Sequence, residues 1–224
     1  MEMGISPCAV FEQVERANMK LLLFSDLHRD VSAATRIVEL ARGADVIVGA
    51  GDFASVRHGT SICIEVLRAI HIPAVLVPGN NESLGELAAA CADWSSAVVL
   101  HGTSIEVGGL VFFGIGGGIP ITPFGDWSYD FSEAQAAELL RACPPGAVLV
   151  SHSPPKGVVD VDASGRSLGS TAVRDAVIRL RPRLVVCGHI HASGGNRAQI
   201  GTTPIVNAGP RGLIFDLKSD SRTT

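Results

Sequence analysis

The chain has 224 residues, of which 46% are hydrophobic, and its formal net charge is −4. A chain of this length is expected to form one domain with a large buried core, and without a run of basic residues an extended nucleic-acid-binding face is not expected. The five cysteines form no C-x-x-C pair, which predicts free thiols in a reducing compartment. No stretch resembles a signal-peptide core or the ~20 apolar residues that span a bilayer. We therefore predict a cytoplasmic protein with no membrane partner.

The first 18 residues differ in pattern from the rest of the chain. They contain no clear strand, and Met19 directly precedes the first predicted strand. Two interpretations stay open: residues 1–18 are a short helix or arm packed on the body, or they are an extension of a chain whose natural start is Met19. Residues 19–224 are expected to form the single domain.

The first half of that domain alternates between short apolar runs and segments with helical spacing. The Val- and Leu-rich runs predict buried strands at residues 21–24, 46–49, 74–77 and 97–100. Between them, apolar residues at helical spacing predict helices at residues 31–42, 61–70 and 82–94. This alternation is typical of parallel strands joined by crossover helices.

The second half begins differently and then returns to alternation. Gly108 and Gly109 join two runs that predict a hairpin at residues 104–107 and 110–114. A helix at residues 132–143 starts with a capping box of Ser132 and Gln135. Further segments follow: strands at 147–150, 184–187, 203–206 and 212–217, and a helix at 170–180. The predicted fold is therefore α/β, a four-layer α/β/β/α sandwich of two facing mixed β-sheets flanked by helices.

Polar side chains stand where five of the predicted strands end. Ligands bind outside the carboxyl ends of strands in open α/β sheets, so these side chains are expected to converge on one edge. In extended chain, residues i and i+2 point the same way, which allows a D-x-H or H-x-H pair to reach one ion. The set is rich in metal ligands: Asp26, His28, Asp52, Asn80, Asn81, His152, His189 and His191.

The order of these pieces resembles that of the calcineurin-like metallophosphoesterase superfamily. The pieces are D-x-H, G-D, G-N, a histidine at a strand end, and G-H-x-H, and they extend from residue 20 to about residue 209. PGNNE, SHSPPKG, GHIHASGG and VNAGP are most similar to small prokaryotic phosphoesterases related to cyclic-nucleotide phosphodiesterases.

The resemblance implies two divalent metal ions. It assigns Asp26, His28 and His191 to one ion and Asn80, His152 and His189 to the other, with Asp52 bridging both. Nitrogen and oxygen donors suit Mn, Fe, Zn or similar ions without choosing among them. The implied reaction is hydrolysis of a small phosphate ester, a phosphodiester or nucleotide foremost, by attack of a metal-bridging hydroxide. The alternatives are a phosphomonoesterase or nucleotidase, and a non-catalytic metal-binding scaffold. No oligomeric state is predicted.

One position departs from the common pattern of the superfamily. Many relatives have histidine after the G-N pair, where this chain has Asn81. Asn81 is expected to be catalytic and to contact substrate, but an amide donates a hydrogen bond without delivering a proton near neutral pH. His101 is the alternative proton donor, and Arg29 and Lys156 are the further candidates for substrate binding. Three aromatic residues fit either a base-stacking wall or packing beneath a long loop: Trp127, Tyr129 and Phe131.

Overall fold

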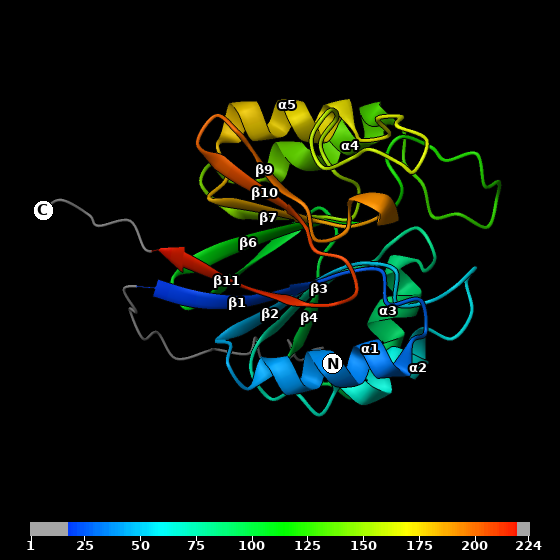
Figure 1. Cartoon of the computed structure of the whole chain (residues 1–224), viewed down its shortest axis with the longest axis vertical. Coiled ribbons are helices and arrows are strands. Elements are labelled where there is room, and N and C mark those ends of the chain that lie inside the picture. Colours follow the sequence, from blue (N-terminus) through cyan, green and yellow to red (C-terminus); the bar gives the residue numbers. More distant parts are fainter. Residues whose placement is uncertain (1–17, 219–224) are drawn as a thin grey trace, which may run out of the picture.

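The computed structural model describes residues 18–218 and has four layers. Two β-sheets face each other, and helices cover the outer face of each (Figure 1). The first sheet is covered by α1 (Val31–Ala41), α2 (Thr60–Leu67) and α3 (Leu84–Ala90). The second is covered by α4 (Glu133–Leu139), which continues as a 3₁₀ turn (Leu140–Ala142), and α5 (Thr171–Leu180). The predicted α/β/β/α sandwich is therefore confirmed.

The first sheet has five strands in the order β11-β1-β2-β3-β4. Strands β1 to β4 are parallel, and β11 pairs with β1 in the antiparallel sense. Because β1, β2 and β3 run the same way, their carboxyl ends lie at one edge of the sheet. The bounds of these strands are β1 Asn18–Phe24, β2 Val46–Ala50, β3 Ala74–Val77, β4 Ala97–Val99 and β11 Leu213–Lys218.

The second sheet has six strands in the order β5-β6-β7-β8-β10-β9. Its four central strands are parallel, and its two edge strands β5 and β9 are antiparallel to their neighbours. The carboxyl ends of β7 and β8 therefore also lie together. The bounds are β5 Thr103–Val107, β6 Leu110–Ile115, β7 Val148–Ser151, β8 Leu184–Cys187, β9 Arg197–Ile200 and β10 Thr203–Asn207.

The central strands are apolar on both faces because each sheet is buried on both sides. In β1, Leu21 and Leu23 belong to the core between the two sheets, whereas Leu22 and Phe24 belong to the core beneath α1 to α3. A third core lies between the second sheet and helices α4 and α5. Strands buried on both faces have continuous apolar runs rather than alternation, which is the pattern that the sequence shows.

Several local predictions can be compared with the structure. The hairpin through Gly108 and Gly109 and the capping box of Ser132 and Gln135 are confirmed. Strand β9 was not predicted, because its sequence RAQI is a polar edge strand without apolar alternation. Helix α3 begins two residues later than predicted, after Ser83, whose hydroxyl accepts a hydrogen bond from the backbone N–H of Glu86. The predicted helix at 61–70 ends earlier, at Leu67.

The two interpretations of residues 1–18 concern chain outside the described residues, apart from Asn18, which is the first residue of β1. Within residues 18–218, the four cysteines are buried free thiols, as predicted. None of the helices in this range is both long enough and apolar enough to cross a bilayer.

Candidate metal centre

The candidate ligands stand on loops with strained backbone. Asp26, His28, Asp52 and His189 have positive φ values of 57°, 43°, 60° and 66°. Residues other than glycine rarely adopt this left-handed conformation, and such strain concentrates at functional sites. The loops after β1 and β2 also hold each other, because the N–H groups of Asp26 and His28 donate to the carbonyls of Gly51 (2.9 Å) and Asp52 (2.9 Å).

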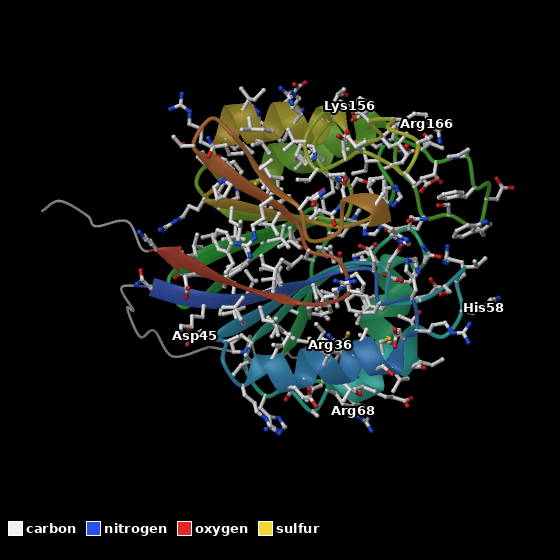
Figure 2. All side chains as sticks on the ribbon, in the orientation of Figure 1. Arg36, Asp45, His58, Arg68, Lys156 and Arg166 are labelled. Atoms are coloured by element: carbon white, nitrogen blue, oxygen red, sulfur yellow. The ribbon has the colours of Figure 1, made fainter. Side chains whose placement is uncertain are left out.

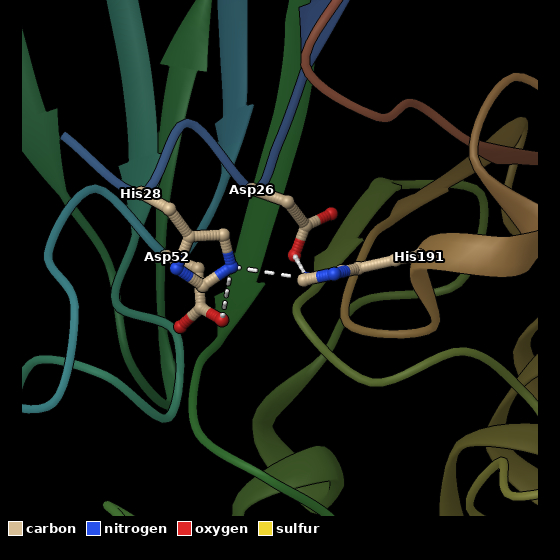
Figure 3. A group of neighbouring side chains, drawn as sticks. All are labelled: Asp26, His28, Asp52 and His191. Atoms are coloured by element: carbon tan, nitrogen blue, oxygen red, sulfur yellow. Dashed lines mark hydrogen bonds and ion pairs between the residues drawn. The ribbon is translucent and has the colours of Figure 1, made fainter. Parts of the chain in front are cut away.

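The first group of candidate ligands comprises Asp26, His28, Asp52 and His191 (Figure 3). His28 Nε2 lies 3.4 Å from Asp52 Oδ2 and 3.0 Å from His191 Nε2. His191 Nε2 is in turn 3.7 Å from Asp26 Oδ1. His28 and His191 are 163 positions apart in the chain, so the two sheets together build this group.

The second group comprises Asp52, His152 and His189, with Asn80 beside them. His152 Nε2 lies 3.5 Å from Asp52 Oδ1 and 3.2 Å from Asn80 Oδ1. The rings of His152 and His189 are 4.9 Å apart between centroids. Asp52 belongs to both groups, and each of its oxygens faces a different one. The seven predicted ligands therefore lie together, with Asp52 in the middle.

The orientation of two of the imidazole rings suits a cation. His28 Nδ1 is 3.0 Å from the carbonyl of Ala54, and His152 Nδ1 is 2.7 Å from the carbonyl of Ala50. A carbonyl only accepts, so each Nδ1 donates to its carbonyl and each Nε2 is directed into the site. Burial and the charge of His152 lower the pKa of His189 to about 3, which leaves its ring neutral at pH 7.

The central carboxylate is charged. Burial opposes ionisation, but the charges of His152 and His28 and the hydrogen bond from the Asn81 N–H outweigh it and lower the pKa of Asp52. Imidazole nitrogens, an ionised carboxylate and an amide oxygen, without thiolate, are donors that fit Mn, Fe, Zn and related ions. The residues present therefore fit a metal centre with two groups of ligands around one shared carboxylate.

Comparison with known proteins shows the family. A family model of the calcineurin-like phosphoesterase superfamily domain matches residues 19–219. The chain belongs to this superfamily. It is 32% identical over 145 residues to human metallophosphoesterase domain-containing protein 1, an alignment that covers 62% of this chain and 41% of the human protein. It is 31% identical over 130 residues to UPF0046 protein T07D4.2 of Caenorhabditis elegans, covering 56% of this chain and 32% of that protein. The chain thus spans less than half the length of either relative.

Solved structures share the fold of this calcineurin-like phosphoesterase. The protein TT1561 of Thermus thermophilus matches with a TM-score of 0.70 and 19% identity, covering 89% of this chain and 99% of that one. A dimetal phosphatase from Danio rerio matches with a TM-score of 0.55 and 12% identity, covering 84% of this chain and 86% of that one. The superfamily comprises metal-dependent phosphoester hydrolases, and its members typically use a dinuclear metal centre.

Glu82 is a buried residue of the candidate site that was not predicted from the sequence. It is fully buried, and its carboxylate accepts hydrogen bonds from the N–H groups of Asp52 (2.9 Å), Gly79 (2.7 Å) and Ala54 (2.9 Å). Burial and the charge of Asp52 raise the pKa of Glu82 to about 7. It joins the loops after β2 and β3, so it positions Asp52 without facing the cavity. In the sequence, the feature that could have indicated this role is the position of Glu82 directly after the candidate ligand Asn80 and Asn81.

Asn207 has a similar role for the G-H-x-H loop. Its side chain is fully buried, and Nδ2 donates to the carbonyls of Gly188 (3.1 Å) and Ile190 (3.1 Å), which flank His189. The backbone N–H of His189 donates to Asp26 Oδ1 at 3.0 Å. The VNAGP piece therefore contributes a residue that holds the loop carrying two candidate ligands.

Asn81 lines the cavity at the candidate metal centre, and its side chain is bound to Asp52. Its Nδ2 donates to Asp52 Oδ2 at 2.8 Å, and its Oδ1 accepts from the N–H of Val56 at 2.7 Å. Its backbone N–H donates to the other Asp52 oxygen at 2.9 Å. The amide is thus engaged in holding the shared carboxylate. This geometry favours positioning of Asp52 over direct contact with the leaving group, and the catalytic role stays a prediction.

The other predicted substrate residues do not meet at the site. Lys156 Nζ donates to the carbonyl of Ser167 at 2.6 Å, and Figure 2 shows it beside α5. Arg29 is exposed and does not line the cavity at the candidate metal centre. His101 accepts from the N–H of Gly116 at 3.1 Å and likewise does not line that cavity. Their roles in substrate binding and proton transfer stay predictions without geometric support.

The cavity at the metal centre has a volume of about 620 Å³. Five of the candidate ligands line it, together with residues of two loops, 119–131 and 160–169. The three aromatic residues have different surroundings. Trp127 lines the cavity, whereas Tyr129 and Phe131 pack against the ring of His101, with centroids 5.9 Å and 4.8 Å from it.

Proposed function

We propose that this chain is a two-metal-dependent phosphoesterase that hydrolyses phosphodiesters or nucleotides. The observation that carries the proposal is the place of Asp52, whose two oxygens face two separate groups of imidazoles. Asp26, His28 and His191 would hold one ion, Asn80, His152 and His189 the other, and Asp52 would be shared. When bound, two divalent ions neutralise charge on the phosphate oxygens and lower the pKa of a water molecule between them.

The chain's own contribution is to hold these ligands in place. Asn81 fixes both oxygens of Asp52, and Glu82 fixes the backbone that carries it. The Nδ1 hydrogen bonds of His28 and His152 fix the orientation of their rings. Ligands held this way need little reorganisation when negative charge develops on a phosphate, and such preorganisation is a major source of catalysis.

The leaving group must depart without an imidazole proton donor in the cavity. Every histidine that lines the cavity among the described residues is a candidate ligand. General acid catalysis is typically worth ~10²–10⁴-fold, so an enzyme without it favours leaving groups that are stable as anions. Aryl esters are therefore expected to react much faster than alkyl esters.

The charge of the cavity favours a diester. Beyond the candidate ligands, Arg166 is the one cationic side chain that lines it within residues 18–218. Its Nε and Nη2 atoms already donate to Asp162 Oδ2 at 3.0 Å and 2.9 Å. A diester carries one negative charge and a monoester up to two, so the diester demands less positive charge from the protein. This is the argument for preferring phosphodiesterase over the alternative, a phosphomonoesterase or nucleotidase.

The test combines metal content with turnover. Purified protein loaded with Mn²⁺ is assayed with bis(p-nitrophenyl) phosphate and with p-nitrophenyl phosphate, with and without excess chelator, and its metal is counted by elemental analysis. We expect close to two ions per chain, faster hydrolysis of the diester, and loss of both activities on chelation. Asp52→Asn, which removes the shared carboxylate, should lose both activities; Asp93→Asn, at an exposed position, is its matched control and should keep them.

Each outcome separates the candidates. Faster hydrolysis of the monoester would support the monoesterase. Two bound ions without hydrolysis of either ester would support a metal-binding interaction scaffold. Hydrolysis that is unaffected by chelation would contradict a metal-dependent mechanism altogether.

A further inference from the structure

The part of the cavity away from the metal centre is apolar. Ile121, Phe124 and Trp127, from the loop at residues 119–131, line it together, and we call them the apolar wall. Ile121 is 65% exposed and Phe124 is 51% exposed. Leu168, from the loop at residues 160–169, lines the same cavity and is 40% exposed. Large apolar side chains gathered at a cavity mark a binding surface.

The apolar wall presents flat rings. Phe124 and Trp127 are stacked, with centroids 5.7 Å apart and planes 16° from parallel. Flat aromatic surfaces bind other rings by stacking, and this attraction depends little on the substituents of the ring. The nearby guanidinium of Arg166 is paired with the carboxylate of Asp162. Among the described residues, the cavity therefore offers no unpaired Lys or Arg side chain to bind an additional phosphate.

The loop that carries the wall is held firmly against the metal centre. The N–H and hydroxyl of Thr122 both donate to Asp130 Oδ2, at 2.8 Å and 2.6 Å. The hydroxyl of Ser128 donates to Asp130 Oδ1 at 2.8 Å and accepts from Nδ2 of the candidate ligand Asn80 at 3.0 Å. Arg57 donates to the carbonyl of Trp127 at 3.3 Å. A wall anchored in this way is preorganised, so a ligand does not have to order it.

We infer that the substrate is an ester with a single phosphate and a flat ring system, aryl or nucleobase, and that this ring stacks on the apolar wall while the phosphate lies at the metal centre. The inference rests on the proposed function. It follows from the continuity of the cavity, because a phosphate at the candidate ligands places its organic group beside the wall. The wall would thus determine specificity, and the metal centre the reaction.

The test uses two phosphonates that cannot be hydrolysed and differ by a ring. Binding of phenylphosphonate and of methylphosphonate to the Mn²⁺-loaded protein is measured by calorimetry, with quenching of tryptophan fluorescence as a second signal. Stacking of one ring predicts a preference for the phenyl compound of about 5- to 150-fold. Phe124→Ala should remove most of that preference, and Phe124→Leu, which stays apolar but not flat, should remove part of it.

The control is Ile178→Ala on α5, since Ile178 is 53% exposed and lies outside the cavity. This variant should keep the full preference. If wild type binds both phosphonates equally, or if Phe124→Ala keeps the preference, the inference is wrong while the proposed function stands. A change in sedimentation mass on Phe124→Ala, with the preference intact, would show that the wall contacts another protein copy and would also overturn the inference. Failure to bind metal, or either phosphonate, would overturn both.

Discussion

The contact between Asn81 and Asp52 offers a direct test of how the shared carboxylate is held. Asn81→Asp keeps the shape of the side chain and the acceptor for the N–H of Val56, but it replaces the Nδ2 donor with a carboxylate oxygen. That oxygen would lie about 2.8 Å from Asp52 Oδ2. At an effective dielectric constant of about 20, two unit charges at this separation repel by about 6 kcal/mol, or roughly 4 pKa units.

The metal-free variant should avoid this repulsion by keeping one proton on the pair at pH 7. The folded-state pKa of the introduced carboxyl is then raised above its unfolded value of about 3.9. Because the folded-state pKa is raised, the free energy of unfolding of the variant is closest to that of wild type below about pH 4. It falls relative to wild type as the pH rises from about 4 toward about 8. At about 1.4 kcal/mol per pH unit, the deficit in the free energy of unfolding reaches about 4 kcal/mol at pH 7.

The measurement is chemical denaturation of wild type and variants in excess chelator at several pH values. Asn81→Ala loses two hydrogen bonds and should cost about 2–4 kcal/mol with little dependence on pH. Asn196→Ala, at an exposed asparagine, should change stability by less than about 0.5 kcal/mol. If the deficit of Asn81→Asp is the same at pH 5 and pH 8, the introduced carboxylate does not meet Asp52, and the positioning role of Asn81 is refuted.

Three further predictions concern the same site. Asp52→Ala should leave fewer than two ions per chain by elemental analysis and abolish hydrolysis of bis(p-nitrophenyl) phosphate; two retained ions would show that Asp52 is not shared. Gly79→Ala would place a Cβ against the backbone and carboxylate of Asp52 and should lower the unfolding free energy by at least about 1–3 kcal/mol. Gly85→Ala, in open space within α3, should raise it by up to about 1 kcal/mol. Equal effects of the two substitutions would contradict the close approach of Gly79 to Asp52. Asn207→Ala removes the donor shared by the Gly188 and Ile190 carbonyls. It should lower the free energy of unfolding by about 1–3 kcal/mol and weaken Mn²⁺ binding in calorimetry. Loss of stability with unchanged Mn²⁺ binding would mean that Asn207 does not position His189.

The elements of the fold were largely readable from local pattern. Strands buried on both faces appear as short Val- and Leu-rich runs, and helices covering a sheet show apolar residues every three or four positions. Turn and capping chemistry added detail, as at Gly108-Gly109 and Ser132. The edge strand β9 was missed because a strand with exposed polar side chains has no hydrophobic signal. Its strand character comes from pairing with β10, which is a tertiary contact.

The candidate ligands were readable for a different reason. Parallel strands bring their carboxyl ends to one edge, so polar residues that follow several such strands converge whatever their separation along the chain. His28 and His191 lie 3.0 Å apart between their Nε2 atoms although 163 positions separate them. The order of the D-x-H, G-D, G-N and G-H-x-H pieces added the resemblance to a family that the comparisons then showed.

What only the tertiary structure decided is where the remaining polar and aromatic side chains point. Sequence adjacency placed Asn81, Arg29 and Lys156 near the site. Asn81 does line the cavity, with its amide bound to Asp52, whereas Lys156 donates to the carbonyl of Ser167 and Arg29 does not line the cavity. Trp127 faces the cavity while Phe131, four residues further, packs with His101. A loop has no fixed periodicity, so the direction of each side chain depends on the partners that satisfy its hydrogen bonds and cover its apolar surface. Those partners come from distant segments, which is why local pattern predicted the candidate ligands, whereas the three-dimensional structure was needed for the residues that hold them and for those that line the cavity beside them.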